Sequence, residues 1–337
     1  MRNTWLAVAA GAACVALAAG AQDAKRDEAK KREEGVAVRG VHPPKHDMTQ
    51  IDAVPEACWA EVRTQHVYFA HGPVGGDVLK GVNAILEERP EIAWKIVPYG
   101  ETGDAAAPTA GGGAKNATPP TKEGERSTST VFAAPSIVEG PAGADGDPKA
   151  KIDRFVSRLR SKEGAQVEVA TLLLSTGDIV RGTDVEALAR HYFDAMKSLS
   201  GERPTLRVLH CTVPLDFPDS GMRAKLRKMT GRGFDHANAL RGRFNDLLRA
   251  EYGRDRIIDI AHAMSERADG THCTVRVGAV RWSALAPEHA DDDGNLNVEG
   301  RCALGCEFML SLVRPCEAAR APKEPEVTVV PGSGGAD

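Results

Sequence analysis

Apolar runs of strand length alternate with amphipathic stretches of helix length along most of the chain. The strand-like runs are 67–70, 92–97, 167–174, 206–213 and 256–261, with a further short extended piece at 129–134. The helix-like stretches are 74–88, 150–159, 185–199, 237–252 and 301–313. Because parallel strands need long, usually helical crossovers, this alternation predicts a parallel sheet covered by helices on both faces. We therefore expect an α/β fold, a three-layer α/β/α sandwich around a central, mostly parallel five-stranded sheet.

Polar and glycine-containing segments follow three of these strand-like runs. They are 71–76, 175–178 and 214–216. The run 167–174 is the most apolar and is expected at the centre of the sheet. Ligands of open α/β sheets bind outside the carboxyl ends of the strands. A site is therefore expected where these three segments meet.

The first residues are typical of a secretory signal peptide. Arg2 precedes a short apolar run, and Ala19, Gly20 and Ala21 form a small-residue cleavage signal before Gln22. We expect removal of residues 1–21 and a secreted or periplasmic, bacterial-type location. Lipidation at Cys14 and an uncleaved anchor are disfavoured alternatives. No other apolar run approaches the roughly 20 residues of a membrane helix, so no membrane span is expected after cleavage.

Composition divides the rest of the chain. Residues 22–50 form a charged extended arm, 51–316 the α/β domain, and 317–337 a disordered tail rich in glycine at its end. Within the domain, 101–129 is rich in Gly, Ala, Thr and Pro and is expected to be a flexible insertion. The net charge is −4. Binding to nucleic acid needs a concentrated basic face, so this mild acidity argues against it.

Six of the seven cysteines lie beyond the signal peptide, an even number that permits disulfides in an exported chain. Spacing does not fix the pairing; Cys302–Cys316 and Cys58–Cys273 are the pairs that we consider. Cys302 and Cys306 share a helix face, but no second ligand pair accompanies them. We therefore expect disulfides or buried thiols, no metal and no cofactor.

Two segments resemble blocks of a hydrolase superfamily. Residues 66–79 combine a buried strand, a glycine-rich turn and a helix start, and residues 291–300 are a polar loop leading into a helix. They resemble the first and last blocks of the Ser-Gly-Asn-His (SGNH, GDSL-type) hydrolases. In the bacterial exported branch these blocks run Phe-x-His-x-Ser-Val-Gly and Asp-x-Gly-His-Leu-Asn-x-x-Gly. Weaker similarities extend the resemblance over about 64–313, and it implies an SGNH-hydrolase-like, flavodoxin-like sandwich.

The resemblance places unsuitable residues at two catalytic positions. Pro73 takes the nucleophile position, and its ring has no heteroatom that can attack a carbonyl. Asn295 takes the position of the histidine base, and a neutral amide cannot relay a proton. Asp292 matches the aspartate that orients the base, three residues earlier.

The oxyanion region is also changed. Gly75 lies in the turn of the first block, and Gly143 begins a segment that resembles the family's Gly-x-Asn. Asp145 then stands where an amide donor is expected, and its carboxylate would repel a developing oxyanion.

These substitutions favour an exported, catalytically degenerate pseudoenzyme that acts as a binding or scaffold module. Loss of the nucleophile or the base alone lowers turnover by about 10⁶ in serine hydrolases of this logic. Its expected partner is a small ester, a glycan or an envelope protein.

The alternative is an active esterase or acyl hydrolase, for example on acylated carbohydrate, with a rebuilt catalytic site. Ser175 paired with His71 or His289 would supply one, although a serine in a turn is usually a cap or turn former. A metal site of His71, His289 and the acids 291–293 would supply another. The acids lack the spacing of a calcium loop and are more typical of a solvated loop.

Overall fold

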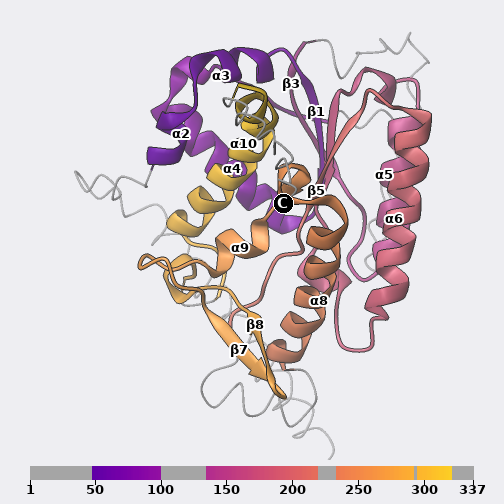
Figure 1. Cartoon of the computed structure of the whole chain (residues 1–337), viewed down its shortest axis with the longest axis vertical. Coiled ribbons are helices and arrows are strands. Elements are labelled where there is room, and N and C mark those ends of the chain that lie inside the picture. Colours follow the sequence, from indigo (N-terminus) through magenta and orange to yellow (C-terminus); the bar gives the residue numbers. More distant parts are fainter. Residues whose placement is uncertain (1–47, 100–133, 219–232, 292–293, 321–337) are drawn as a thin grey trace, which may run out of the picture. The chain divides into compact units, whose positions relative to one another are not determined.

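The computed structural model describes residues 48–99, 134–218, 233–291 and 294–320. The signal peptide, most of the arm, the insertion 101–129 and the tail beyond Arg320 lie outside these ranges. All described residues belong to one unit, 47–337. Within that unit, helices lie on both faces of a parallel sheet (Figure 1), which confirms the predicted α/β/α architecture.

Among the described residues the sheet has six strands, one more than predicted. They are β1 His66–His71, β2 Ile96–Pro98, β3 Ser136–Pro141, β4 Val169–Leu172, β5 Arg207–Cys211 and β6 Ile257–Ile258. Their order is β2-β3-β1-β4-β5-β6, and every pairing is parallel. The two innermost strands are thus β1 and β4, which agrees with the central place predicted for the run 167–174.

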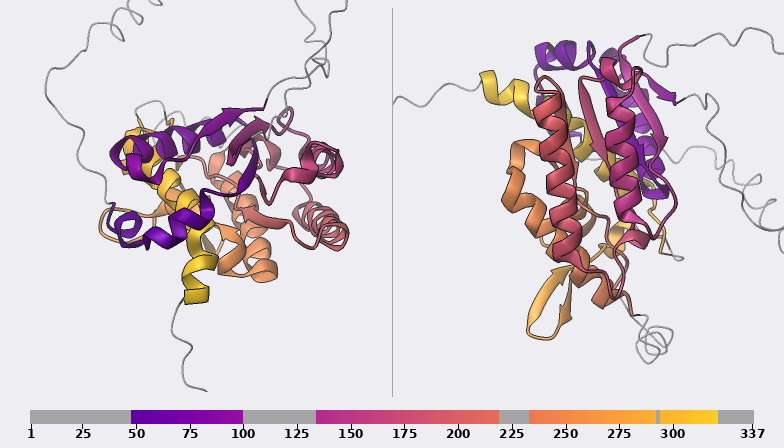
Figure 2. Two further views of the ribbon diagram at one scale, coloured as in Figure 1. Left: turned by 90° about the horizontal axis from the view of Figure 1, so that it is seen from above. Right: turned by 90° about the vertical axis from the view of Figure 1, so that its right-hand side faces the viewer.

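Two layers of helices cover the sheet (Figures 1 and 2). One layer holds α2 Thr49–Ala53, α3 Glu56–Val62, α4 Pro73–Glu88, α9 Ile260–Ser265 and α10 Val298–Arg320. The other holds α5 Pro148–Arg160, α6 Val185–Glu202 and α8 Phe234–Tyr252. Successive side chains of a strand point to opposite faces. Accordingly, Val67 and Phe69 of β1 join the first core, whereas Tyr68 and Ala70 join the second.

Short elements complete the fold. A two-stranded antiparallel hairpin, β7 Thr274–Val277 and β8 Val280–Ser283, packs against α8 (Figure 1). Single 3₁₀ turns occur at η1 Pro90–Ile92, η2 Gly164–Gln166, η3 Thr176–Asp178, η4 Arg254–Arg256 and η5 Pro287–His289. None of the described helices is both long enough and apolar enough to span a membrane.

Several predicted boundaries differ from the structure. The extra strand, β3, follows the expected extended piece 129–134 instead of coinciding with it. The run 256–261 forms only a two-residue strand, because the Asp259 side chain accepts a hydrogen bond from His262 N and starts α9. Helix α10 continues to Arg320, four residues into the predicted tail.

The disulfide also differs from both pairs considered from sequence. Cys58 of α3 is bonded to Cys316 of α10, with 5.6 Å between their Cα atoms. The pairs Cys302–Cys316 and Cys58–Cys273 are therefore wrong. Cys302 and Cys316 lie on one helix and are separated by roughly 21 Å at a rise of about 1.5 Å per residue. Cys211, Cys273 and Cys302 are buried free thiols.

Candidate functional site

The turn after β1 carries no nucleophile. Gly72 caps α4, and Pro73 is its first residue, where a missing N–H is tolerated and the fixed backbone angle suits a helix start. Pro73 is exposed. The strand, turn and helix expected around this position are therefore present, with a pyrrolidine ring at the tip.

His71, the last residue of β1, braces this turn. Its Nδ1 lies 2.7 Å from the Gly72 carbonyl oxygen, and its Nε2 lies 3.1 Å from Oε2 of Glu139. A Cβ added at Gly75 would lie 2.2 Å from Cβ of His71, so only glycine leaves room for the histidine side chain. Gly75 and His71 thus form a packed pair at the start of α4, with both imidazole nitrogens engaged.

A polar cluster with three buried members and one exposed member, Asp145, lies at the carboxyl ends of β3 and β4. Ser175 follows β4 and caps η3, and its Oγ donates to Asp145 Oδ1 at 2.7 Å. Lys151 of α5 donates to Asp145 Oδ1 and Asp178 Oδ2, each at 2.7 Å, and lies 3.3 Å from Ser175 Oγ. The Lys151 and Asp178 side chains are 1% and 0% exposed. We call these four residues the Lys151 cluster.

In the Lys151 cluster one ammonium is paired with two carboxylates. A buried ammonium is stabilised when carboxylates pair with it. The hydrogen bond from Lys151, aided by that from Ser175, lowers the pKa of the Asp145 carboxyl. Asp145 is therefore ionised near neutral pH, and the Ser175 hydroxyl hydrogen points to a weak base.

The cluster reaches the turn of the first block. A Cβ added at Gly72 would lie 3.7 Å from both Asp145 Oδ1 and Ser175 Cβ. Gly143 has a φ of +132°, a value that favours glycine, and precedes Asp145 in the same loop. The structure thus brings Gly143, Asp145 and Ser175 to the edge that carries Pro73.

The residues of the last block lie in a loop before α10. Asn295 is exposed; its N–H donates to Asp291 Oδ1 at 2.9 Å, and its carbonyl accepts from Asp291 N at 2.8 Å. Asp292 and Asp293 lie outside the described residues. The loop approaches Phe217 after β5, since a Cβ at Gly294 would lie 4.0 Å from Phe217 Cβ.

His289 is not joined to Ser175. It lies in η5 and packs against Gly300 at the start of α10, and its buried Nδ1 has no hydrogen-bond partner among the described residues. In the part of the chain that the structure describes, the Ser175 hydroxyl contacts only Asp145, Asp178 and Lys151. Neither His71 nor His289 is its partner there. Within the same ranges, no group of three metal-binding side chains is present.

Sequence reasoning missed two residues that build this edge. Lys151 precedes Phe155 by four residues and Leu159 by eight, so helical spacing places it on the buried face of α5. This helical spacing is the sequence feature that indicates burial of Lys151. Arg241 of α8 donates to the carbonyls of Thr176 and Ile179 and pairs with Asp216 Oδ2 at 2.7 Å. It thereby ties η3 to the loop after β5.

No protein-family model and no curated protein sequence matches this chain. Solved structures of GDSL-type lipases and esterases match it. One is a GDSL-like lipase from Bacteroides thetaiotaomicron, with 10% identity, a TM-score of 0.37, and coverage of 76% of this chain and 90% of that chain. Another is an acetyl esterase mutant determined with an acetate ion, with 11% identity, a TM-score of 0.39 and coverage of 76% and 99%. At such identities these matches carry no information on chemistry, which must be judged from the residues of this chain.

Proposed function

We propose that this chain is an exported, SGNH-like module without hydrolase activity, which binds a small ester, a glycan or an envelope protein at the carboxyl edge of its sheet. One observation carries the proposal. Pro73 occupies the turn where a nucleophile is required, and the hydroxyl that lies beside this turn, Ser175, is held by Asp145, Asp178 and Lys151.

The chemistry of the edge supports inactivity in three ways. Pro73 cannot form an acyl intermediate. The Asn295 side chain cannot take up a proton near neutral pH. The carboxylate of Asp145, whose pKa is lowered by its hydrogen bond from Lys151, would raise the energy of a tetrahedral oxyanion beside it. Each step of ester hydrolysis therefore lacks a suitable group.

The alternative, an active esterase with a rebuilt site, rests on the contact between Ser175 and Lys151. Serine–lysine pairs are catalytic when the lysine is neutral and can accept the serine proton. Here Lys151 donates to two carboxylates, and an ammonium has no lone pair with which to accept a proton. The contact favours a structural role for Ser175.

The test is hydrolysis by the purified mature protein of short-chain acyl esters and acetylated sugars. We expect no turnover above background. Turnover that is lost in Ser175→Ala but kept in Ser157→Ala, an exposed serine on α5, would establish the alternative. Turnover that survives Ser175→Ala but is lost on chelation would indicate the metal site of His71, His289 and the 291–293 acids.

Export is tested separately, by mass spectrometry of the protein from the producing cells. The small residues before Gln22 predict a mature chain that starts at Gln22. A full-length, cytoplasmic product would contradict export and leave the argument on catalysis untouched.

A further inference from the structure

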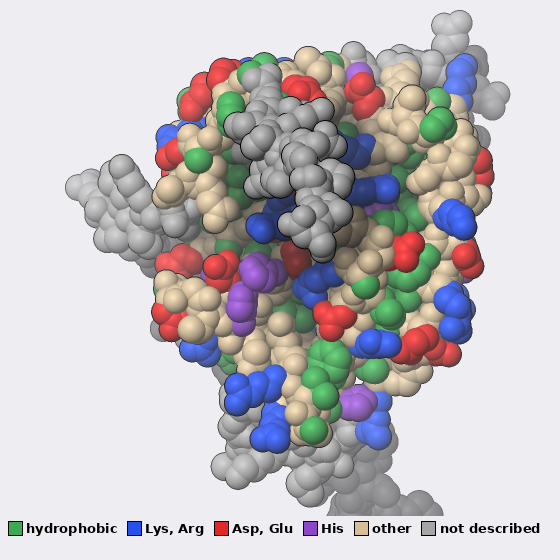
Figure 3. Space-filling view, viewed as in Figure 1, with side chains coloured by type: hydrophobic (Ala, Val, Ile, Leu, Met, Phe, Trp, Pro, Cys, Tyr) green, Lys and Arg blue, Asp and Glu red, His purple; other side chains and the backbone are tan. Residues whose placement is uncertain are grey.

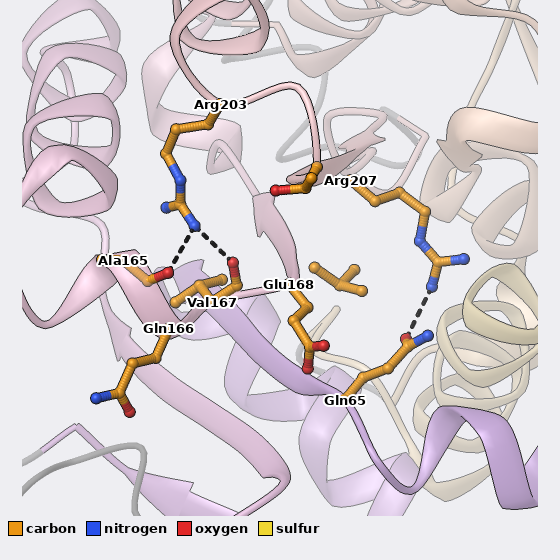
Figure 4. A pocket seen from close by; sticks show the side chains of 9 residues that line it. Gln65, Ala165, Gln166, Val167, Glu168, Arg203 and Arg207 are labelled. Atoms are coloured by element: carbon orange, nitrogen blue, oxygen red, sulfur yellow. Dashed lines mark hydrogen bonds between the residues drawn. The ribbon is translucent and has the colours of Figure 1, made fainter.

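A cavity of about 350 Å³ lies at the amino ends of β4 and β5, at the edge of the sheet opposite to Ser175 (Figure 4). Arg203 and Arg207 line it from the segment that enters β5, and Glu168 lines it from the residue before β4. Two guanidinium groups thus border one small space together with a single carboxylate.

Arg207 has an incompletely paired guanidinium. Its Nη2 donates to Gln65 Oε1 at 3.1 Å and to the Leu312 carbonyl at 3.2 Å. Its Nε is buried without a partner, and among the described residues Nη1 donates to no group and no carboxylate lies within ion-pair distance. Burial lowers the pKa of Arg207, and the charge of Glu61 offsets this only in part.

Arg203 is fixed in place without being neutralised. Its Nη1 donates to the carbonyls of Leu159 and Gly164, and its Nη2 donates to those of Ala165 and Val167. Figure 4 shows two of these bonds at the cavity wall. In the described ranges it forms no ion pair with a carboxylate. The four carbonyls therefore hold a positive charge at the cavity in a fixed orientation.

Glu168 does not neutralise either arginine by direct contact. Its Oε2 accepts from the His66 backbone N–H at 2.9 Å and lies 3.3 Å from the His66 Nδ1. In Figure 4 its side chain lies between the two arginines, and no hydrogen bond joins it to them. The cavity thus keeps an excess of positive charge over negative charge.

We propose that this cavity binds a small oxyanion, the carboxylate or phosphate group of a small molecule, between Arg203 and Arg207. Among the described residues, Nη1 of Arg207 is left to donate a charge-assisted hydrogen bond to either anion. Arg203, whose Nη hydrogens are taken by four carbonyls, contributes its positive charge. The cavity volume is at the lower end of the range for small-molecule sites, which begins at about 300 Å³. The site is at the other edge of the sheet from Pro73, so the proposal is independent of the proposed function.

Calorimetric titration of the full chain with inorganic phosphate and with acetate, at constant ionic strength and with chloride as the reference, tests this. Saturable binding of phosphate or acetate is expected, and the better-bound anion identifies the group recognised. Arg207→Gln should weaken it by at least about tenfold, the effect of losing one charge-assisted hydrogen bond. Arg243→Gln, which removes an exposed arginine that pairs with Glu186, should leave it unchanged.

A second variant keeps the test decisive if Arg207→Gln does not fold. Glu168 is 55% exposed, and Glu168→Gln removes the only acid that lines the cavity without burying a new group. We expect tighter binding by severalfold. Absence of saturable binding in the native protein, or equal affinity in the native protein and Glu168→Gln, would overturn the proposal.

Discussion

The buried cations at the two edges of the sheet differ in their partners. At the carboxyl edge, Lys151 contacts two carboxylates and a hydroxyl, so its positive charge is fully paired. At the amino edge, Arg207 has amide and carbonyl partners but, within the part of the chain that the structure describes, no carboxylate partner. A paired ammonium cannot accept a proton, whereas an unpaired guanidinium can attract an anion. The edge that carries Pro73 and Ser175 is thus the one whose buried cation is already paired with carboxylates.

The largest effect is expected from Lys151→Met. This change leaves Asp178, whose side chain is 0% exposed, without its cation. Removal of one partner of a buried ion pair destabilises by about 3–5 kcal/mol. Denaturant unfolding would measure the loss, with the exposed Lys149→Met as the matched control, for which less than about 0.5 kcal/mol is expected. Equal stability of the two variants would show that the Lys151 cluster does not hold this edge.

The next effect concerns the covalent link near the amino edge. The disulfide joins Cys316 to Cys58, and Leu312, one turn before Cys316, accepts a hydrogen bond from Arg207. Reduction, or the paired change Cys58→Ser with Cys316→Ser, should lower the free energy of unfolding by about 2–4 kcal/mol. Cys302→Ser serves as the control, because Cys302 is a buried cysteine outside this disulfide. No change on reduction would mean that the edge is stable without the link.

A smaller effect is expected from Arg207→Met, which sharpens the contrast with Lys151→Met. The variant removes a charge that has no ion pair and an Nε without a partner, and it loses the bonds to Gln65 and Leu312. These terms oppose each other, so the stability should change by no more than about 1 kcal/mol. If Arg207→Met lowered the free energy of unfolding as much as Lys151→Met, the two cations would not differ in how strongly their partners stabilise the fold.

The smallest effect is expected in the pH dependence of stability, through Asp145 at the carboxyl edge. The pKa of Asp145 is lowered from 3.8, first by the hydrogen bond from Lys151. Its contribution to stability is therefore present above about pH 4 and is lost as the pH falls below the unfolded value. In unfolding experiments between pH 2 and 5 (a range chosen around that value), Asp145→Asn should show a weaker pH dependence than the native protein. Asp194→Asn, an exposed carboxylate on α6, should retain the native dependence.

Strong periodicity made much of the fold predictable from the sequence. The strands β1 and β4 and the helices α4, α5 and α6 have apolar residues at regular spacing and lie close to their predicted positions. Strand β3 was missed because the sequence Ser-Ile-Val-Glu-Gly-Pro offers only a two-residue apolar run next to a low-complexity segment. The short β6 was overextended because the cap at Asp259 acts through a side chain, which apolar spacing does not show.

The candidate site was only partly predictable. The turn at Pro73 and the placement of Ser175 at a strand end follow from local patterns. The partners of Ser175 come from three separate segments, and Lys151 would ordinarily be assigned to solvent because lysine is rarely buried. Its contact with Asp145 and Asp178 depends on how α5 packs against the loops, a property of tertiary structure.

The most direct test of the central claim is labelling of the native protein with a serine-directed fluorophosphonate, followed by peptide mass spectrometry. We predict no adduct at any serine, because the Ser175 hydroxyl donates to a carboxylate that is only a weak base and proline at position 73 has no nucleophilic side chain. The paired change Pro73→Ser with Asn295→His is the positive comparison, since it restores both missing groups and should give a weak adduct at position 73. A fluorophosphonate adduct at Ser175 of the native protein would contradict the account.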